Sequence, residues 1–215
     1  MIISAQRRYV FVHIPKTGGT AMALALEGRA ARDDILVGDT PKALARRRRL
    51  KGLQVPGRLW KHSTLTDIDG LVDLSGMFIF TLVRNPWDRV VSYYHWLRHQ
   101  DFDHPAVARA KALDFSGFLN HPGTASSLQS APYASYVTDA GGVMRASLFI
   151  RLEHLSTDLA PLTAHLGFAP VLPIANQSDR GRDWRPYYSD ADAATLARIC
   201  AADIASFTYR FDPGA

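Results

Sequence analysis

The sequence predicts an α/β fold with a central parallel sheet flanked by helices, and three observations support this prediction. Two apolar runs, Tyr9–Ile14 and Met77–Arg84, have the length and continuous apolar character of strands buried on both faces. A helical pattern follows each run, beginning at Thr20 and at Pro86. A length of 215 residues, with 47% hydrophobic and 21% charged residues, suits one domain spanning residues 1–215.

The glycine turn after the first predicted strand has the features of a phosphate-binding loop. It contains Lys16, Thr17, Gly18 and Gly19, and Thr20 opens the helix. Adjacent glycines let backbone N–H groups approach an anion, while the helix N-terminus and the lysine add positive charge. In the GxxxxGK[ST] loop of nucleotide triphosphatases the lysine follows the second glycine, whereas here it precedes both. The spacing therefore indicates a different kind of anion site.

A weaker strand is predicted at Asp34–Gly38, and a helix is predicted from Pro41 onward, through the run Arg46–Arg49. Four consecutive arginines cover most of the circumference of a helix, so a solvated helix is the simpler interpretation. The alternative is that the run attracts an acidic acceptor or an anionic surface.

The segment KHST, Lys61–Thr64, precedes the second apolar run. A helix is predicted to begin at Ser63 or Thr64, with Asp67 near its first turn. This places His62 just outside a helix start, where we expect an exposed side chain.

A second potential anion site follows the second predicted strand. Asn85 is a good N-cap, Pro86 suits the first helical position, and Asp88 lies in the first turn. Ser92 shares a helix face with Asn85 and Asp88. Arg84 and Ser92 can therefore converge on a ligand at the carboxyl end of the sheet, where open α/β sheets bind ligands.

The other elements are less strongly marked. We expect one short helix at Phe115–Asn120 within the otherwise irregular segment Asp101–Gly142, which forms a lid, an acceptor-binding wall or an inert surface insertion. A strand is expected at Ala146–Leu152 and a helix at Glu153–Leu166. A polar, basic loop at Asn176–Arg182 and a long helix at Asp190–Phe207 complete the chain.

The ordered set HIPKTGGT, KHST, VRNPWDRVVSYY, IRLEHL, ANQSDRGRDWRPYY and DIASFTYRF resembles the sulfotransferases that use 3′-phosphoadenosine 5′-phosphosulfate, PAPS. The likeness is closest to the carbohydrate branch, which includes the heparan 2-O-sulfotransferases and small bacterial relatives. It covers most of the chain and is weakest over Asp101–Gly142. The resemblance implies a three-layer, P-loop-like fold, with PAPS as donor and 3′,5′-ADP as product. One departure is Thr208, where the family often has glycine.

The resemblance also implies roles for individual residues. His62 matches the catalytic base, and Lys16 matches a residue that both binds the donor and supports catalysis. The other donor-binding residues are Thr17, Gly18, Gly19 and Thr20 for the 5′-phosphosulfate, Arg84 and Ser92 for the 3′-phosphate, and Ser178, Arg180 and Arg182 in the segment that closes over the nucleotide.

Each assignment has a structural alternative. The glycines can serve only as a strand-to-helix turn, Arg84 can neutralise Asp88, and Ser92 can be a buried helix serine. His62 can be a loop residue with a backbone hydrogen bond. His13, in the first predicted strand, is expected to be a satisfied core histidine.

Composition limits the remaining function classes. The formal charge of +5, from 25 basic and 20 acidic residues, fits a protein that handles anions. Cys200 is the only cysteine, and no signal peptide or membrane-spanning run is recognisable, so a cytoplasmic bacterial enzyme is expected. No metal is expected, because the histidines and the cysteine show no ligand spacing such as HExxH.

The expected partner is a hydroxylated acceptor, such as an anionic glycan or a lipid-linked sugar, and not nucleic acid. Two other functions remain open. A nucleotide kinase would require Mg²⁺ and ATP, and the absence of GxxxxGK[ST] argues against it. A non-catalytic polyanion- or nucleotide-binding protein would use Arg46–Arg49 and show a steep salt dependence.

Overall fold

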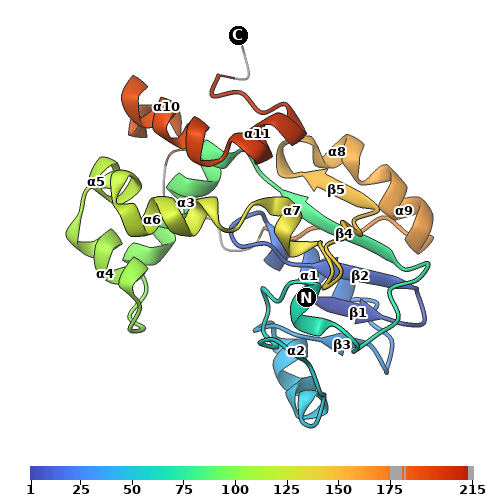
Figure 1. Ribbon diagram of the computed structural model, residues 1–215. Helices are drawn as coiled ribbons and strands as arrows, with labels where there is room; N and C mark the ends of the chain where they lie inside the picture. Colours follow the sequence, from blue (N-terminus) through green and yellow to red (C-terminus); the bar gives the residue numbers. More distant parts are fainter. Residues whose placement is uncertain (175–180, 182, 213–215) are drawn as a thin grey trace. The chain divides into compact units, whose positions relative to one another are not determined.

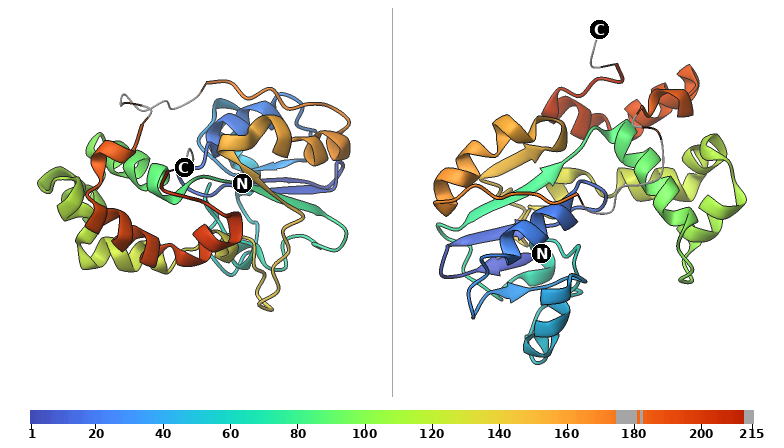
Figure 2. Two further views of the ribbon diagram at one scale, coloured as in Figure 1. Left: turned by 90° about the horizontal axis from the view of Figure 1, so that it is seen from above. Right: turned by 180° about the vertical axis from the view of Figure 1, so that it is seen from behind.

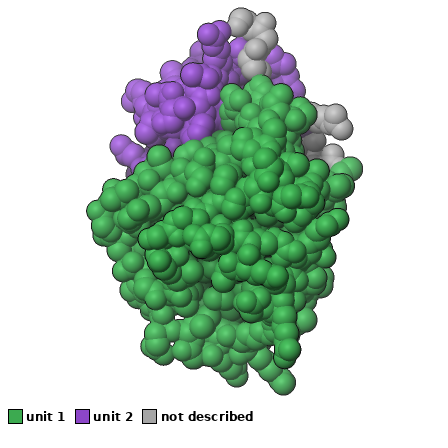
Figure 3. All heavy atoms as spheres, turned by 90° about the vertical axis from the view of Figure 1, so that its right-hand side faces the viewer, with its two compact units in different colours: residues 1–83, 133–176 green, residues 84–132, 177–215 purple. Residues whose placement is uncertain are grey.

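The computed structural model describes residues 1–174, 181 and 183–212, and it has an α/β architecture (Figure 1). Ser178, Arg180 and Arg182 lie outside the described residues. The chain forms two compact units, coloured in Figure 3. Unit 1 is Met1–Val83 with Tyr133–Asn176, and unit 2 is Arg84–Pro132 with Gln177–Ala215. Each unit is therefore assembled from two separate stretches of the sequence.

Unit 1 contains a five-stranded sheet in the order β3-β1-β2-β4-β5. The strands are β1 (Ile2–Ser4), β2 (Tyr9–Val12), β3 (Ile35–Leu36), β4 (Phe78–Val83) and β5 (Leu148–Arg151). As predicted, β4 is a central strand, parallel to β2 on one side and β5 on the other. The sheet as a whole is mixed, because β1 runs antiparallel to both β2 and β3. Sequence analysis missed β1, whose apolar run is too short to be recognised.

Helices cover both faces of this sheet. On one face, α1 (Gly19–Glu27), α8 (Leu155–Asp158) and α9 (Ala160–Leu166) pack on strand residues that include Phe11, Phe80 and Ile150 (Figure 2). On the other face, Val10, Val12 and Ile79 pack with Leu65 and Ile68, and α7 (Tyr133–Tyr136) lies beside them. Alternate residues of one strand thus enter different cores, which is why the apolar runs are continuous.

Unit 2 is helical. Its helices are α3 (Pro86–Arg98), α4 (Pro105–Ala112), α5 (Phe115–Asn120), α6 (Pro122–Gln129), α10 (Asp190–Ile199) and α11 (Ala201–Phe207). The core contains Val91 and Tyr94 of α3, Phe118 of α5 and Leu196 of α10. Asn85 caps α3 as predicted, since its side chain accepts a hydrogen bond from the Trp87 N–H.

The segment Asp101–Gly142 is more regular than the sequence suggested. The α5 prediction is confirmed, but the expectation of loops elsewhere is wrong, because α4, α6 and α7 also lie there. Pro105 and Pro122 are the first residues of α4 and α6, a position that suits proline. The side chains of His104 and His121 cap these helices, and histidine is not a usual N-cap signal.

Three other predicted helices differ in detail. The helix from Pro41 is confirmed as α2 (Pro41–Arg46), followed by the 3-10 helix Arg47–Leu50. The helix expected near Ser63 is only a 3-10 turn at Thr66–Ile68, and the one expected at Glu153–Leu166 is divided among the 3-10 helix Leu152–His154, α8 and α9.

The C-terminal prediction of one long helix is wrong, because α10 and α11 are separated at Cys200, where the backbone leaves helical geometry without a proline or glycine. Thr208 ends α11 at φ 54°, in the left-handed region that favours glycine. Thr208 therefore occupies a position where a glycine would relieve backbone strain.

Candidate active site

The predicted phosphate loop lies between the end of β2 at Val12 and the start of α1 at Gly19. Lys16 has φ 66° and Gly18 has φ 86°, so two residues of this short turn occupy the left-handed region. Such a conformation is uncommon for a lysine and is frequent at functional sites. The Thr17 hydroxyl is buried and donates to the Ile14 carbonyl over 2.9 Å. The Thr17 side chain is thus used within the turn.

The two glycines are required for different reasons. Gly18 supplies the left-handed conformation at the N-cap of α1. At Gly19, a methyl group would lie 2.0 Å from Cδ2 of His13. The His13 ring therefore packs directly against the first turn of α1, and only glycine fits beneath it.

The first turn of α1 keeps its N–H groups available. Gly18 provides no side-chain cap, and its carbonyl accepts hydrogen bonds from the N–H groups of Ala21 and Met22. Within the described part of the chain, no hydrogen bond from the N–H of Gly19 or Thr20 is found. These groups, the helix dipole and Lys16 together form an arrangement suited to an anion.

His62 is held next to this loop by a hydrogen bond to the main chain. Its Nδ1 lies 2.7 Å from the carbonyl oxygen of His13, three residues before Lys16. A carbonyl oxygen only accepts, so Nδ1 carries the hydrogen and, in the neutral ring, Nε2 has the free lone pair. The alternative of a loop histidine with a backbone hydrogen bond is thus compatible with a role as a base.

The prediction that His62 is exposed is wrong. His62 is partly buried, with its ring centroid 4.6 Å from that of His13 and 4.9 Å from that of Trp60, both edge-on. Burial lowers the pKa of His62 to about 4, although the bond to the His13 carbonyl acts in the opposite direction. Burial and the neighbouring His62 hold the pKa of His13 well below its usual range. Both imidazoles are therefore neutral near pH 7.

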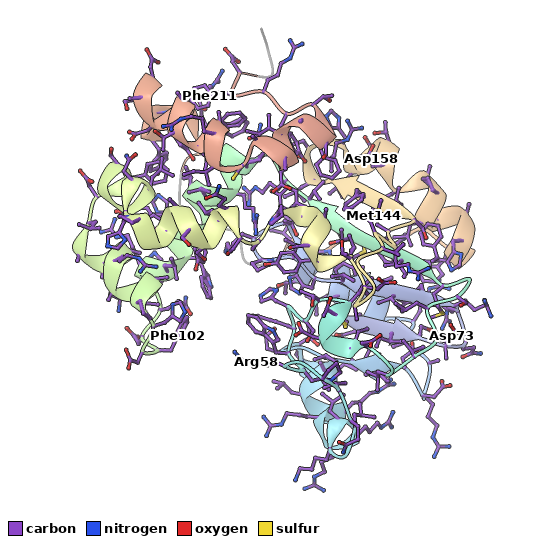
Figure 4. The ribbon with its side chains drawn as sticks, viewed as in Figure 1. Arg58, Asp73, Phe102, Met144, Asp158 and Phe211 are labelled. Atoms are coloured by element: carbon purple, nitrogen blue, oxygen red, sulfur yellow. The ribbon has the colours of Figure 1, made fainter. Side chains whose placement is uncertain are left out.

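Residues around His62 include two that sequence analysis did not single out. Lys61 pairs with Asp39 over 2.5 Å. Lys61, His13 and Thr20 line one small pocket, which links the KHST segment to the first turn of α1. Trp60 is partly exposed, and the guanidinium of Arg58 lies 4.6 Å from the centre of its ring (Figure 4 labels Arg58). An aromatic residue two positions before a candidate base was a usable signal in the sequence.

Arg84 and Ser92 belong to unit 2. Arg84 forms an ion pair with Asp88, with its Nη2 2.7 Å and its Nε 2.8 Å from one carboxylate oxygen. This is the neutralising contact that the sequence left open as an alternative. Ser92 is buried on α3. The structure thus gives Arg84 a fixed orientation, and its role toward a phosphate stays a prediction.

The described residues contain no cluster of three or more His, Cys, Asp or Glu side chains placed to hold a metal ion. None of the helices that the structure describes is both long enough and apolar enough to cross a membrane.

The sequence matches no family model, and no curated protein matches it. Among solved structures, one neighbour is mouse sulfotransferase SULT7A1 in complex with PAP. The two share 16% sequence identity with a TM-score of 0.49, over 94% of this chain and 85% of the mouse chain. A likeness at this level does not transfer a function, so the chemistry has to be argued from this chain's own residues.

Proposed function

We propose that this protein is a sulfotransferase that moves the sulfuryl group of PAPS to an acceptor hydroxyl, with His62 as general base. The observation that carries the proposal is the hydrogen bond between Nδ1 of His62 and the carbonyl of His13. It fixes a neutral imidazole with a free Nε2 beside the strand end that leads into Lys16 and the two glycines.

The loop fits the phosphosulfate end of the donor. When bound, PAPS supplies an activated sulfuryl group attached to a 5′-phosphate. Lys16 and the N–H groups of Gly18, Gly19 and Thr20 would hold this end and stabilise the negative charge that develops on the leaving phosphate. The first turn of α1 supports this role, because no hydrogen bond from the N–H of Gly19 or Thr20 is found within the described residues.

The other end of the donor is assigned to unit 2. Arg84 and Ser92 would bind the 3′-phosphate, and a guanidinium suits a phosphate because it donates in a planar fork. Ser178, Arg180 and Arg182 would close over the nucleotide.

His62 would take the proton that the acceptor hydroxyl loses. Its pKa of about 4 keeps Nε2 unprotonated at neutral pH. An anion bound at the adjacent loop favours the protonated form, so occupancy by the donor raises the pKa and strengthens the base. This is general acid–base catalysis coupled to charge stabilisation. In it, the protein positions the donor and the acceptor and forms no covalent intermediate with them.

The acceptor is proposed to be a carbohydrate or another hydroxylated molecule, such as a lipid-linked sugar. Trp60 supports this assignment, because its ring lies 4.9 Å from that of His62 and is 37% exposed. An aromatic face beside the base provides a surface on which a sugar ring can pack. A cytoplasmic location is part of the proposal, since Cys200 is the only cysteine in the sequence and its thiol is buried.

The test has two parts. Calorimetry should show binding of 3′,5′-ADP without Mg²⁺, and release of 3′,5′-ADP from PAPS should be measured against a panel of hydroxylated acceptors. His62→Ala should bind the nucleotide normally and lose turnover by about 10²- to 10⁴-fold. Failure to bind either nucleotide, or binding of MgATP instead, would refute the proposal.

A further inference from the structure

Apart from Trp60, the segment Pro41–Lys61, called here the basic arm, is not used by the proposed function. It contains eight cationic residues and no acidic residue: Lys42, Arg46, Arg47, Arg48, Arg49, Lys51, Arg58 and Lys61. We propose that the basic arm is a docking surface for a lipid bilayer with anionic headgroups. This inference does not depend on the identity of the reaction.

The arm is attached firmly to unit 1. Thr40 caps α2 by accepting a hydrogen bond from the Ala43 N–H, and Ala43 packs into the core on the α1 face of the sheet. Leu50 and Leu59 both pack against the core on the opposite face. Its exposed side chains therefore project from a fixed base, so binding would not require ordering a flexible chain.

Most of its charge stays uncompensated. Arg46 donates to the carbonyl of Ala31 over 2.6 Å, and Arg49 donates to that of Arg32. Carbonyl groups are neutral, so these contacts orient the guanidinium groups and leave their charge intact.

Three more cations point outward. Arg47, Arg48 and Lys51 are exposed, and no carboxylate within the described ranges forms an ion pair with any of them. Lys61 is balanced by Asp39, and Lys42 and Arg46 are balanced in part by the carboxylate of Glu27.

Acidic residues that precede the arm offer little compensation. Asp34 is buried and accepts a hydrogen bond from the Ala31 N–H, and Asp39 is engaged with Lys61. Asp33 is exposed and is the one carboxylate of this stretch facing solvent without such a contact in the described structure. The arm and its surroundings therefore carry a clear excess of positive charge.

Apolar side chains accompany these cations and distinguish a bilayer from a soluble polyanion. Leu44 of α2 is 50% exposed, and the exposed Arg47 and Arg48 follow it within one turn, in the adjoining 3-10 helix. Trp60 is 37% exposed beside Arg58. Leucine, tryptophan and arginine side chains all bind favourably at a bilayer interface, whereas binding to a soluble polyanion depends mainly on the cationic side chains.

The experiment is co-sedimentation of the full chain with two kinds of vesicle, one of phosphatidylcholine alone and one of phosphatidylcholine with about 30% of the anionic lipid phosphatidylglycerol. The unchanged protein should bind only the anionic vesicles, and more weakly at high salt. The pair Arg47→Glu with Arg48→Glu should weaken binding by at least about tenfold. The control pair Lys111→Glu with Arg198→Glu makes the same charge change on exposed residues of unit 2 and should bind as the unchanged protein does.

The variant Leu44→Gln tests the apolar contribution at constant charge. It should weaken vesicle binding about threefold or more while leaving binding to immobilised heparin, a soluble polyanion, unchanged. Equal loss in both charge-reversal pairs would overturn the proposal, since binding would then follow net charge alone. No effect of Leu44→Gln, together with full competition by heparin, would overturn it in favour of a soluble polyanion.

Discussion

Nδ1 of His62 donates a hydrogen bond to the backbone carbonyl of His13, although the two residues are 49 positions apart in the sequence. The bond selects the tautomer of His62 and anchors it to the strand that carries the phosphate loop. Any residue at position 13 offers the same carbonyl, so the anchor itself does not depend on the His13 side chain. The His13 ring has a separate role, which is to pack over Gly19.

The pH dependence of turnover should report on His62. Because its pKa is about 4, kcat/KM should be flat near neutral pH and fall about tenfold per pH unit only below that value. Saturation with donor should move the acid limb of kcat to higher pH, because the bound anion favours imidazolium. Steady-state kinetics over a pH series would measure the acid limb of kcat/KM and the acid limb of kcat. An acid limb near the ordinary histidine value in the free enzyme would contradict the burial of His62.

Gly19→Ala should damage the loop. The added methyl group would lie 2.0 Å from the His13 ring, so the ring or the first turn of α1 has to shift. We expect a loss of about 1–3 kcal/mol of stability and much weaker binding of 3′,5′-ADP, measured by urea unfolding and calorimetry.

Gly28→Ala is the matched control for this substitution. Gly28 lies at the other end of α1 with φ −54°, and an added methyl group meets nothing closer than 3.4 Å. It should be neutral or stabilising by up to about 1 kcal/mol, with nucleotide binding unchanged. Equal effects of the two variants would show that the contact with His13 is unimportant.

Arg84→Gln should weaken 3′,5′-ADP binding by about 10- to 100-fold, because a charged hydrogen bond to the 3′-phosphate is lost. Binding of 5′-AMP, which lacks that phosphate, should be unaffected. Calorimetry with the two nucleotides would measure the difference. If both nucleotides bind equally more weakly, Arg84 serves only to pair with Asp88.

Stability should decrease on acidification, because His62 and His13 are neutral in the fold. The folded pKa of His62, about 4, lies below the ordinary value of 6.5, so between these pH values the unfolded chain binds more protons. The free energy of unfolding should therefore rise with pH across this window and level off above it. Urea titrations of the unchanged protein and of His62→Gln would test this, with a shallower rise expected for the variant. An identical rise in both would assign the effect to other groups.

The parts of the fold that sequence predicted are those with strong local signals. The continuous apolar runs predicted β2 and β4, and the helix-start signal at Asn85 and Pro86 predicted α3. The three-residue strand β1 is stabilised by pairing with β2 and β3 on either side, which is tertiary information that a short apolar run does not carry. The helices α4 and α6 were not predicted, because both are short and their N-caps are histidines, which are not a usual signal for a helix start.

The sequence predicted which residues form the candidate site better than it predicted their burial and backbone conformation. Lys16 and the glycines lie between strand and helix as the spacing indicated. The half-buried state of His62 was not predictable, because it arises from His13 and Trp60 packing on both sides of a short turn. The left-handed backbone of Lys16 was likewise invisible, since lysine gives no signal for a positive φ.

The two-segment construction of each unit has a consequence for biosynthesis. Strand β5 begins 65 residues after β4 ends, and the whole of Arg84–Pro132 is made in between. The edge of β4 that pairs with β5 thus stays open on the ribosome until residues beyond Leu148 have emerged, while the helices of unit 2 are already synthesised. Unit 2 likewise cannot complete its fold until α10 and α11 have been synthesised. Neither unit can be obtained by simple truncation, and an exposed β4 edge makes the nascent chain prone to aggregation.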